Sequence, residues 1–136
     1  MAVGVLVITH DGLGEQMLRI AIQTLGFCPL QIEALPVDAD CVVEEMDATA
    51  AVMCQRIDEG DGVLVLTDLY GSTPCNIAFR LLDRPRVAIV SGINLPMLIR
   101  VMNYSSLPLE ALVQKALSGG RDGIVLCDLK QRDFHA

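Results

Sequence analysis

Short, almost continuously apolar runs, separated by amphipathic segments, constrain the fold of this chain more than any other feature. Residues 3–8 (VGVLVI), 63–67 (VLVLT) and 86–90 (RVAIV) carry apolar side chains at neighbouring positions, without polar alternation. A strand of this kind must be covered on both faces, which is typical of a parallel sheet that lies between two layers of helices. These runs therefore predict three buried strands.

The segments between these strands carry apolar residues at helical spacing. Residues 40–59 form the clearest amphipathic pattern, with acidic side chains on the outer face. Pro74 suits the first turn of a helix that Ser72 or Thr73 caps. Glycines after the last apolar position end helices, as Gly26 does here. The predicted helices are a segment whose apolar residues run from Met17 to Leu25, residues 40–59, a segment from residue 74, 94–102, and 109–117 with Gly119-Gly120 behind it.

Two weaker runs complete the pattern. Residues 31–35 predict a more exposed strand that ends at Pro36, and residues 123–126 predict a last strand. The resulting order, βαβαβαβααβ, predicts the α/β class, with a mostly parallel sheet and right-handed crossovers that place helices on both faces. A length of 136 residues, without a linker or an internal repeat, predicts one domain.

Composition excludes several classes of function. The chain has 10 Lys plus Arg against 17 Asp plus Glu, and only 4% aromatic residues, so we expect no nucleic-acid partner. The longest charge-free apolar stretch, residues 87–99, is shorter than the ~18–20 residues of a membrane span. Residues 3–8 lack the basic region and the cleavage site of a signal peptide. We therefore expect a cytoplasmic protein without stable membrane insertion.

Five cysteines occur without a C-x-x-C pair and without a histidine nearby in the sequence. This pattern predicts reduced thiols in a reducing compartment and no zinc site. The Gly12-x-Gly14 pair lacks the third glycine of a dinucleotide fingerprint, and no P-loop lysine follows Gly71. We expect neither a resident metal nor a cofactor.

Polar side chains gather after the predicted strands, at the sheet edge where open α/β sheets bind their ligands. The candidates are Thr9, His10 and Asp11 after the first strand, Asp68, Gly71, Ser72 and Thr73 after the third, and Ser91 and Asn94 after the fourth. The second histidine, His135, is next to the last residue. His10 is therefore the one histidine expected at this edge.

These residue types describe a phosphohistidine site. A histidine acts as a nucleophile when a carboxylate holds the N–H of its other ring nitrogen, and Asp68 is placed to do so. The turn through Ser72 and Thr73 opens a helix, where free N–H groups favour an anion. Each part also has a purely structural interpretation: His10 as a hydrogen-bonded residue at a strand end, Asp68 as a turn former, and Ser72 or Thr73 as a helix cap.

A receiver-like site, with Asp68 as an aspartyl phosphoacceptor, is the second chemical interpretation. It requires several acids near the first strand to hold Mg²⁺, and there the sequence offers Asp11. It also requires a lysine after the fifth strand, whereas Lys130 follows a predicted edge strand. The phosphohistidine interpretation is therefore preferred.

Three segments resemble the IIA domain of the mannose-type sugar phosphotransferase system: residues 5–10 (VLVITH), 67–76 (TDLYGSTPCN) and 91–98 (SGINLPML). The resemblance covers almost the whole chain, so we expect residues 1–130 to form this domain and residues 131–136 a C-terminal tail. It implies a flavodoxin-like, three-layer α/β/α fold with strand order 2-1-3-4. It also implies a homodimer in which the last strand is antiparallel and exchanged between the two subunits.

The resemblance also implies a function. His10 would accept a phosphoryl group on Nε2 from an HPr-like phosphocarrier and pass it to a IIB protein. Asp68 would hold the Nδ1–H group, and Gly71, Ser72 and Thr73 would bind the phosphoryl oxygens. Association with a membrane would run only through a IIC/IID complex.

The chain departs from the family pattern at two points. Asp11 stands directly after the active histidine, where the family usually has glycine, and a carboxylate there repels a phosphoryl group or alters the choice of carrier. The 136 residues contain neither an Ala/Pro-rich linker nor a IIB segment, so we expect a separate IIB acceptor. The alternative is a regulatory binding module whose partner reads the phosphorylation state of His10.

Overall fold

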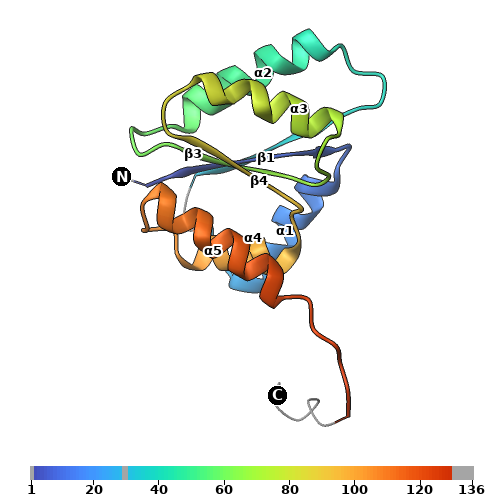
Figure 1. Cartoon of the computed structure of the whole chain (residues 1–136), viewed down its shortest axis with the longest axis vertical. Coiled ribbons are helices and arrows are strands. Elements are labelled where there is room, and N and C mark those ends of the chain that lie inside the picture. Colours follow the sequence, from blue (N-terminus) through green and yellow to red (C-terminus); the bar gives the residue numbers. More distant parts are fainter. Residues whose placement is uncertain (1, 29–30, 130–136) are drawn as a thin grey trace.

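Four parallel strands form one sheet at the centre of the structure, a computed structural model that describes residues 2–28 and 31–129 (Figure 1). The strands are β1 (Gly4–His10), β2 (Ile32–Val37), β3 (Val63–Thr67) and β4 (Val87–Ser91). Their order across the sheet is β2-β1-β3-β4, and every neighbouring pair is parallel. The predicted α/β class and the 2-1-3-4 order are confirmed.

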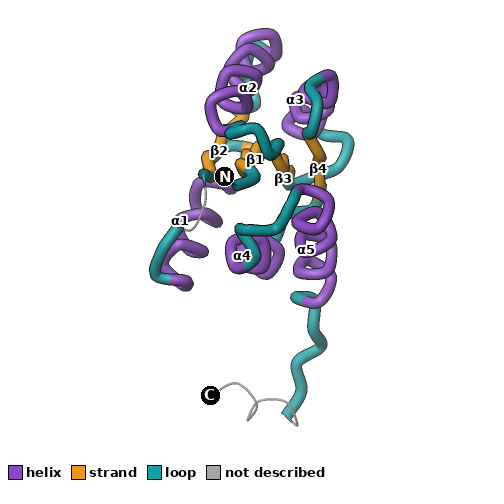
Figure 2. Tube along the Cα trace, turned by 90° about the vertical axis from the view of Figure 1, so that its left-hand side faces the viewer, coloured by secondary structure: helices purple, strands orange, loops and turns teal. Residues whose placement is uncertain are grey.

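Helices cover both faces of the sheet. The helices are α1 (Leu13–Leu25), α2 (Val43–Ile57), α3 (Thr73–Phe79), α4 (Leu95–Asn103) and α5 (Leu109–Asp122), and a short 3-10 turn, η1 (Arg80–Asp83), follows α3. Helices α2 and α3 lie on one face, and α1, α4 and α5 lie on the other, as Figures 1 and 2 show. The three-layer arrangement predicted for the chain is therefore observed.

The two faces of the sheet pack into two separate apolar cores. Along β1, Val5 and Val7 face the core beneath α1, α4 and α5, whereas Leu6 and Ile8 face the core beneath α2 and α3. All four side chains are fully buried. This burial on both faces is the reason that the strand shows no polar alternation.

Several predicted boundaries are wrong in the described residues. The helix predicted at residues 40–59 is shorter and spans Val43–Ile57. Strand β2 continues through Pro36 to Val37, because an edge strand tolerates a proline that lacks an N–H group. Helix α5 continues through Gly119 and Gly120 to Asp122. These glycines serve packing: a Cβ atom on Gly119 would lie 2.8 Å from Cβ of Arg100 in the neighbouring α4.

The strand predicted at residues 123–126 does not form within this single chain. Gly123 ends α5, and the following residues are irregular and exposed. They lead away from the sheet (Figure 1), so they find no strand to pair with inside the chain. The C-terminal tail predicted at residues 131–136 lies outside the described residues.

In residues 2–28 and 31–129, no helix combines the length and the apolar character that a membrane span requires.

Candidate functional site

His10 and Asp68 meet at the carboxyl edge of the sheet. His10 is the last residue of β1, and Asp68 follows β3, its neighbour in the sheet. One carboxylate oxygen, Oδ2 of Asp68, accepts a hydrogen bond from the backbone N–H of His10 at 3.0 Å and lies 2.8 Å from Nδ1 of its ring. The parallel pairing of β1 with β3 therefore brings together two residues that are 58 positions apart.

The environment of Asp68 favours its ionised form. Burial of the carboxylate raises the pKa of Asp68, but the hydrogen bonds from the backbone and the ring of His10 outweigh burial, so the pKa lies below its ordinary value. The other oxygen, Oδ1, accepts the N–H of Leu69 at 3.0 Å. Both oxygens are thus engaged as acceptors.

An ionised Asp68 decides which ring nitrogen of His10 carries the proton. An acceptor at 2.8 Å from Nδ1 places the proton of a neutral ring on Nδ1 and leaves the lone pair on Nε2. The side chain of His10 is 49% exposed, that of Asp68 only 11%. Among the described residues, Nε2 has no hydrogen-bond partner. The arrangement therefore presents an oriented nitrogen nucleophile to solvent.

The turn after Asp68 contains the predicted phosphoryl-binding residues. Gly71 has a φ of +82°, a conformation that glycine adopts without strain. The hydroxyl of Ser72 donates to the carbonyl of Leu69 at 2.6 Å, so its proton is used within the turn. In the described part of the chain, neither the backbone N–H nor the hydroxyl of Thr73 has a partner. Thr73 therefore has two donors to offer a ligand, and the backbone N–H of Gly71 likewise has no partner among the described residues.

Two other candidates make their hydrogen bonds within the fold. The buried hydroxyl of Thr9 accepts the N–H of Gly14 at 2.8 Å and so fixes the start of α1. Asn94 caps α4 by accepting the N–H of Met97 at 2.9 Å, and it donates to the carbonyl of Gly120 in α5 at 3.1 Å. These bonds fix the helices on one side of the site.

Ser91 lies beside a second polar residue, at the end of the neighbouring strand. Thr67 is its direct neighbour across β3 and β4. Both hydroxyl oxygens are buried, and neither has a hydrogen-bond partner among the described residues. Both hydroxyls lie at the carboxyl ends of their strands, and Thr67 directly precedes Asp68 in the sequence.

Asp11 lies on the other side of His10 from Asp68. It lines a groove of about 460 Å³ next to β2 and the start of α2, together with Asp38, Asp40 and Glu45. Asp11 was a predicted site residue, whereas the other three acids were not predicted from the sequence. In the sequence, these three acids follow β2, which neighbours β1 on the side away from β3.

The described residues contain no cluster of three or more His, Cys, Asp or Glu side chains that is arranged to hold a metal ion. The carboxylate of Asp68 also has both oxygens engaged. A receiver-like aspartyl site requires an acidic metal cluster and an accessible aspartate. The geometry therefore favours His10 over Asp68 as the residue that would accept a phosphoryl group.

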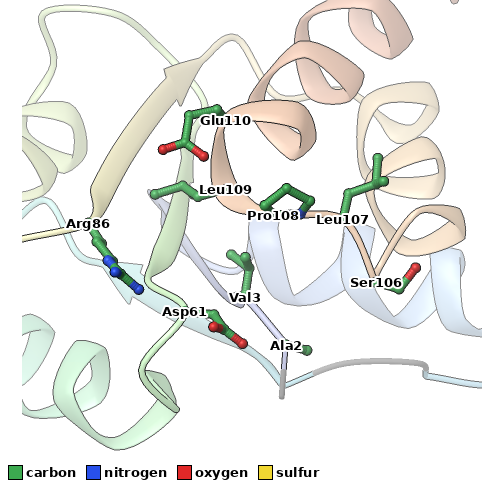
Figure 3. A pocket seen from close by; sticks show the side chains of 9 residues that line it. All are labelled: Ala2, Val3, Asp61, Arg86, Ser106, Leu107, Pro108, Leu109 and Glu110. Carbon is green, nitrogen blue, oxygen red and sulfur yellow. The ribbon is translucent and has the colours of Figure 1, made fainter.

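A cavity of about 410 Å³ lies at the opposite edge of the sheet, where the strands begin (Figure 3). Arg86, Asp61 and Glu110 bring charged side chains to it, and Val3 and Leu109 form apolar parts of its wall. None of the predicted site residues lines it. The candidate site is therefore the edge that carries His10.

The chain is similar in sequence to several known proteins. A family model, EIIA-man, described as the PTS system fructose IIA component, matches residues 4–117. The chain is 29% identical over 136 residues to the PTS system mannose-specific EIIAB component of Escherichia coli (strain K12), with 91% of this chain and 39% of that protein covered. The chain thus spans well under half the length of this curated relative.

Two further comparisons concern regulation and fold. The transcriptional regulatory protein LevR of Bacillus subtilis (strain 168) is 29% identical over 124 residues, with 82% of this chain and 12% of that protein covered. The mannose/sorbose-specific IIA subunit of the phosphotransferase system from Enterococcus faecalis has a TM-score of 0.84 at 24% identity. That match covers 95% of this chain and 97% of the other, and it supports the fold.

Proposed function

Because this chain belongs to the mannose-type family of IIA components of the sugar phosphotransferase system, we propose that Nε2 of His10 carries a phosphoryl group from one partner protein to another. The single observation that carries the proposal is the contact of 2.8 Å between Oδ2 of Asp68 and Nδ1 of His10. It leaves Nε2 as the free, exposed nucleophile.

The transfer requires one bond to break as another forms. The lone pair of Nε2 attacks the phosphorus atom of a phosphohistidine on the donor, and the donor's N–P bond breaks as the new N–P bond forms. The donor imidazole leaves with the electron pair of the broken bond. Asp68 keeps the Nδ1–H proton in place and stabilises the positive charge that develops on the ring of His10.

The turn after Asp68 supplies the groups that hold the phosphoryl oxygens. We assign this role first to the N–H and the hydroxyl of Thr73, because these donors have no partner among the described residues. Gly71 permits the close approach of the backbone. Ser72 contributes the shape of the turn, since its hydroxyl proton is directed at the carbonyl of Leu69.

The site segments, residues 5–10, 67–76 and 91–98, contain no lysine or arginine. A relay benefits from such weak binding, because a phosphoryl group held more tightly than in the transition state would be passed on slowly. We propose that the partner provides the missing cation in trans, as arginines do in other phosphoryl transfers. The donor in this proposal is an HPr-like phosphocarrier, and the acceptor is a IIB-type partner.

A regulatory role is the second candidate, and one observation favours it. LevR, one of the relatives, is a transcriptional regulatory protein. In this version a partner protein reads the phosphorylation state of His10, and no onward transfer occurs. In both versions we propose a cytoplasmic protein, which approaches a membrane only through a IIC/IID complex.

We also propose the homodimer with exchanged C-terminal strands. The segment after α5 is apolar and exposed: Ile124 is 81% exposed and Leu126 is 86% exposed. Strand β4 has β3 on one side and no strand on the other in the described sheet. An antiparallel strand from a second chain would cover this edge and bury these side chains.

The test supplies the chain with phosphoenolpyruvate, enzyme I and HPr. The proposal predicts one acid-labile, base-stable phosphoryl group per chain, and no label on His10→Ala. Uptake of label by His10→Ala would overturn it. Adding IIB proteins then separates the two roles: rapid loss of the label supports transport, and retention supports regulation.

A further inference from the structure

The residue after His10 has an unusual backbone. Asp11 has a φ of +45°, and in the described residues only Arg86 shares a positive φ among residues other than glycine. The left-handed region is unfavourable for most side chains and is best tolerated by Gly, Asn and Asp. A hydrogen bond of 3.0 Å from the N–H of Asp11 to the carbonyl of Val37 holds the turn. The fold therefore demands this conformation, which glycine would adopt at lower cost.

The position of Asp11 places an unpaired charge next to the nucleophile. Asp11 is exposed and makes no ion pair among the described residues. Asp68 forms its hydrogen bonds to His10 from the β3 side, whereas Asp11 lines the groove on the β2 side. Neighbouring residues lie 3.8 Å apart at their Cα atoms, which is shorter than the Debye length of ~8–10 Å in physiological salt.

The rest of the groove adds charge of the same sign. Asp38, Asp40 and Glu45 also line it, and no lysine or arginine does. A phosphoryl group on a side chain carries about −1.5 to −2 charge at neutral pH. Like charges at this range raise the free energy of the phosphorylated form relative to the free imidazole.

We propose that Asp11 sets how readily His10 gives up its phosphoryl group. Its carboxylate weakens the phosphorylated state and shifts the equilibrium with the donor toward the donor's phosphohistidine. The same N–P bond breaks and the same N–P bond forms as in the proposed relay, and Asp11 forms no bond to phosphorus. This inference rests on the proposed function, because it presupposes that His10 is phosphorylated.

The experiment measures the equilibrium constant for phosphoryl exchange between phosphorylated HPr and the chain, by ³¹P NMR at low and at high salt. Asp11→Asn removes the charge and keeps a side chain that tolerates the left-handed conformation. We expect it to raise the phosphorylated fraction of the chain, with an equilibrium constant about fivefold higher at low salt. The difference should shrink at ~0.5 M salt, because ions screen exposed charges.

Two further variants separate charge from backbone conformation. Asp11→Gly also removes the charge but relieves the left-handed backbone, so it should shift the phosphoryl equilibrium as Asp11→Asn does while unfolding at a higher urea concentration. Glu59→Gln removes a charge from the loop that leads into the start of β3, at the opposite edge of the sheet. It should leave the equilibrium unchanged.

The outcomes are distinguishable. An equilibrium constant for Asp11→Asn that equals that of Glu59→Gln, or a change that does not respond to salt, would overturn the role of Asp11. Phosphoramidate, a small phosphoryl donor, provides the separate test of the site. Wild-type chain that takes no phosphoryl group on His10 from phosphoramidate or HPr would contradict the proposed function itself.

Discussion

Oδ2 of Asp68 contacts both the ring Nδ1 and the backbone N–H of His10, at 2.8 Å and 3.0 Å. One carboxylate oxygen therefore fixes the orientation of the ring and the end of the strand that carries it. A carboxylate with this double contact links catalysis to stability, because its loss disturbs the nucleophile and the sheet edge together.

Replacing Asp68 by asparagine tests the catalytic part of this link. The amide removes the negative charge that stabilises the cationic ring and weakens control of the tautomer, so we expect phosphoryl transfer from HPr to slow by about 10²-fold or more. Single-turnover kinetics by rapid quench measures the rate. Asp61→Asn, in the loop before β3, is the matched control and should transfer at the wild-type rate; equal rates for both variants would refute the role of Asp68.

The lowered pKa of Asp68 predicts how stability depends on pH. A carboxylate whose pKa is lower in the folded state stabilises the fold at pH values above its unfolded pKa, about 3.9, and this stabilisation is lost as the pH falls through the folded value. Urea unfolding between pH 7 and pH 3 measures it. The wild type should lose stability below about pH 4 more steeply than Asp68→Asn does, and parallel curves would contradict the assignment.

Replacing Gly119 by alanine tests the packing of α5 against α4. A Cβ atom there would lie 2.8 Å from Cβ of Arg100 and 3.2 Å from the carbonyl of Pro96. Because backbone and Cβ atoms have little room to move, Gly119→Ala should lower the free energy of unfolding by about 1–3 kcal/mol. Gln114→Ala, on the exposed face of α5, should change it by less than about 0.5 kcal/mol in chemical denaturation.

The proposed homodimer with exchanged C-terminal strands predicts the molecular mass of the protein in solution. Light scattering should give twice the 14.7 kDa of one chain. Leu126→Asp places a charge in the proposed interface and should shift the protein toward the monomer. Val52→Asp, at an exposed position of α2, should leave the dimer intact. A monomeric wild type would contradict the proposal.

The architecture followed from local patterns because parallel strands buried on both faces have few alternatives. Runs such as residues 63–67 leave no polar face, and the helical spacing between them completes the α/β order. Errors arose where packing overrides a local signal. Gly119 and Gly120 resemble a helix end, yet the close approach of α4 requires them inside α5.

The sequence predicted the pairing of Asp68 with the ring of His10, but not the hydrogen bonds of the turn that follows Asp68. The position of His10 and Asp68 at neighbouring strand ends follows from the rule for open α/β sheets. The side-chain partners within the turn after Asp68 do not follow from this rule, because they depend on turn geometry. Ser72 and Thr73 look equivalent in the sequence, but the hydroxyl of Ser72 bonds to Leu69 and that of Thr73 stays free among the described residues.

The most direct test of the central claim is to identify the phosphorylated atom. The chain, labelled with ¹⁵N and phosphorylated by HPr, is observed by ¹H–¹⁵N and ³¹P NMR under alkaline conditions that preserve phosphohistidine. The contact between Asp68 and Nδ1 predicts that phosphorus is bound to Nε2 of His10, with the proton retained on Nδ1. A phosphoryl group on Nδ1, on the carboxylate of Asp68 or on no residue at all would contradict the account.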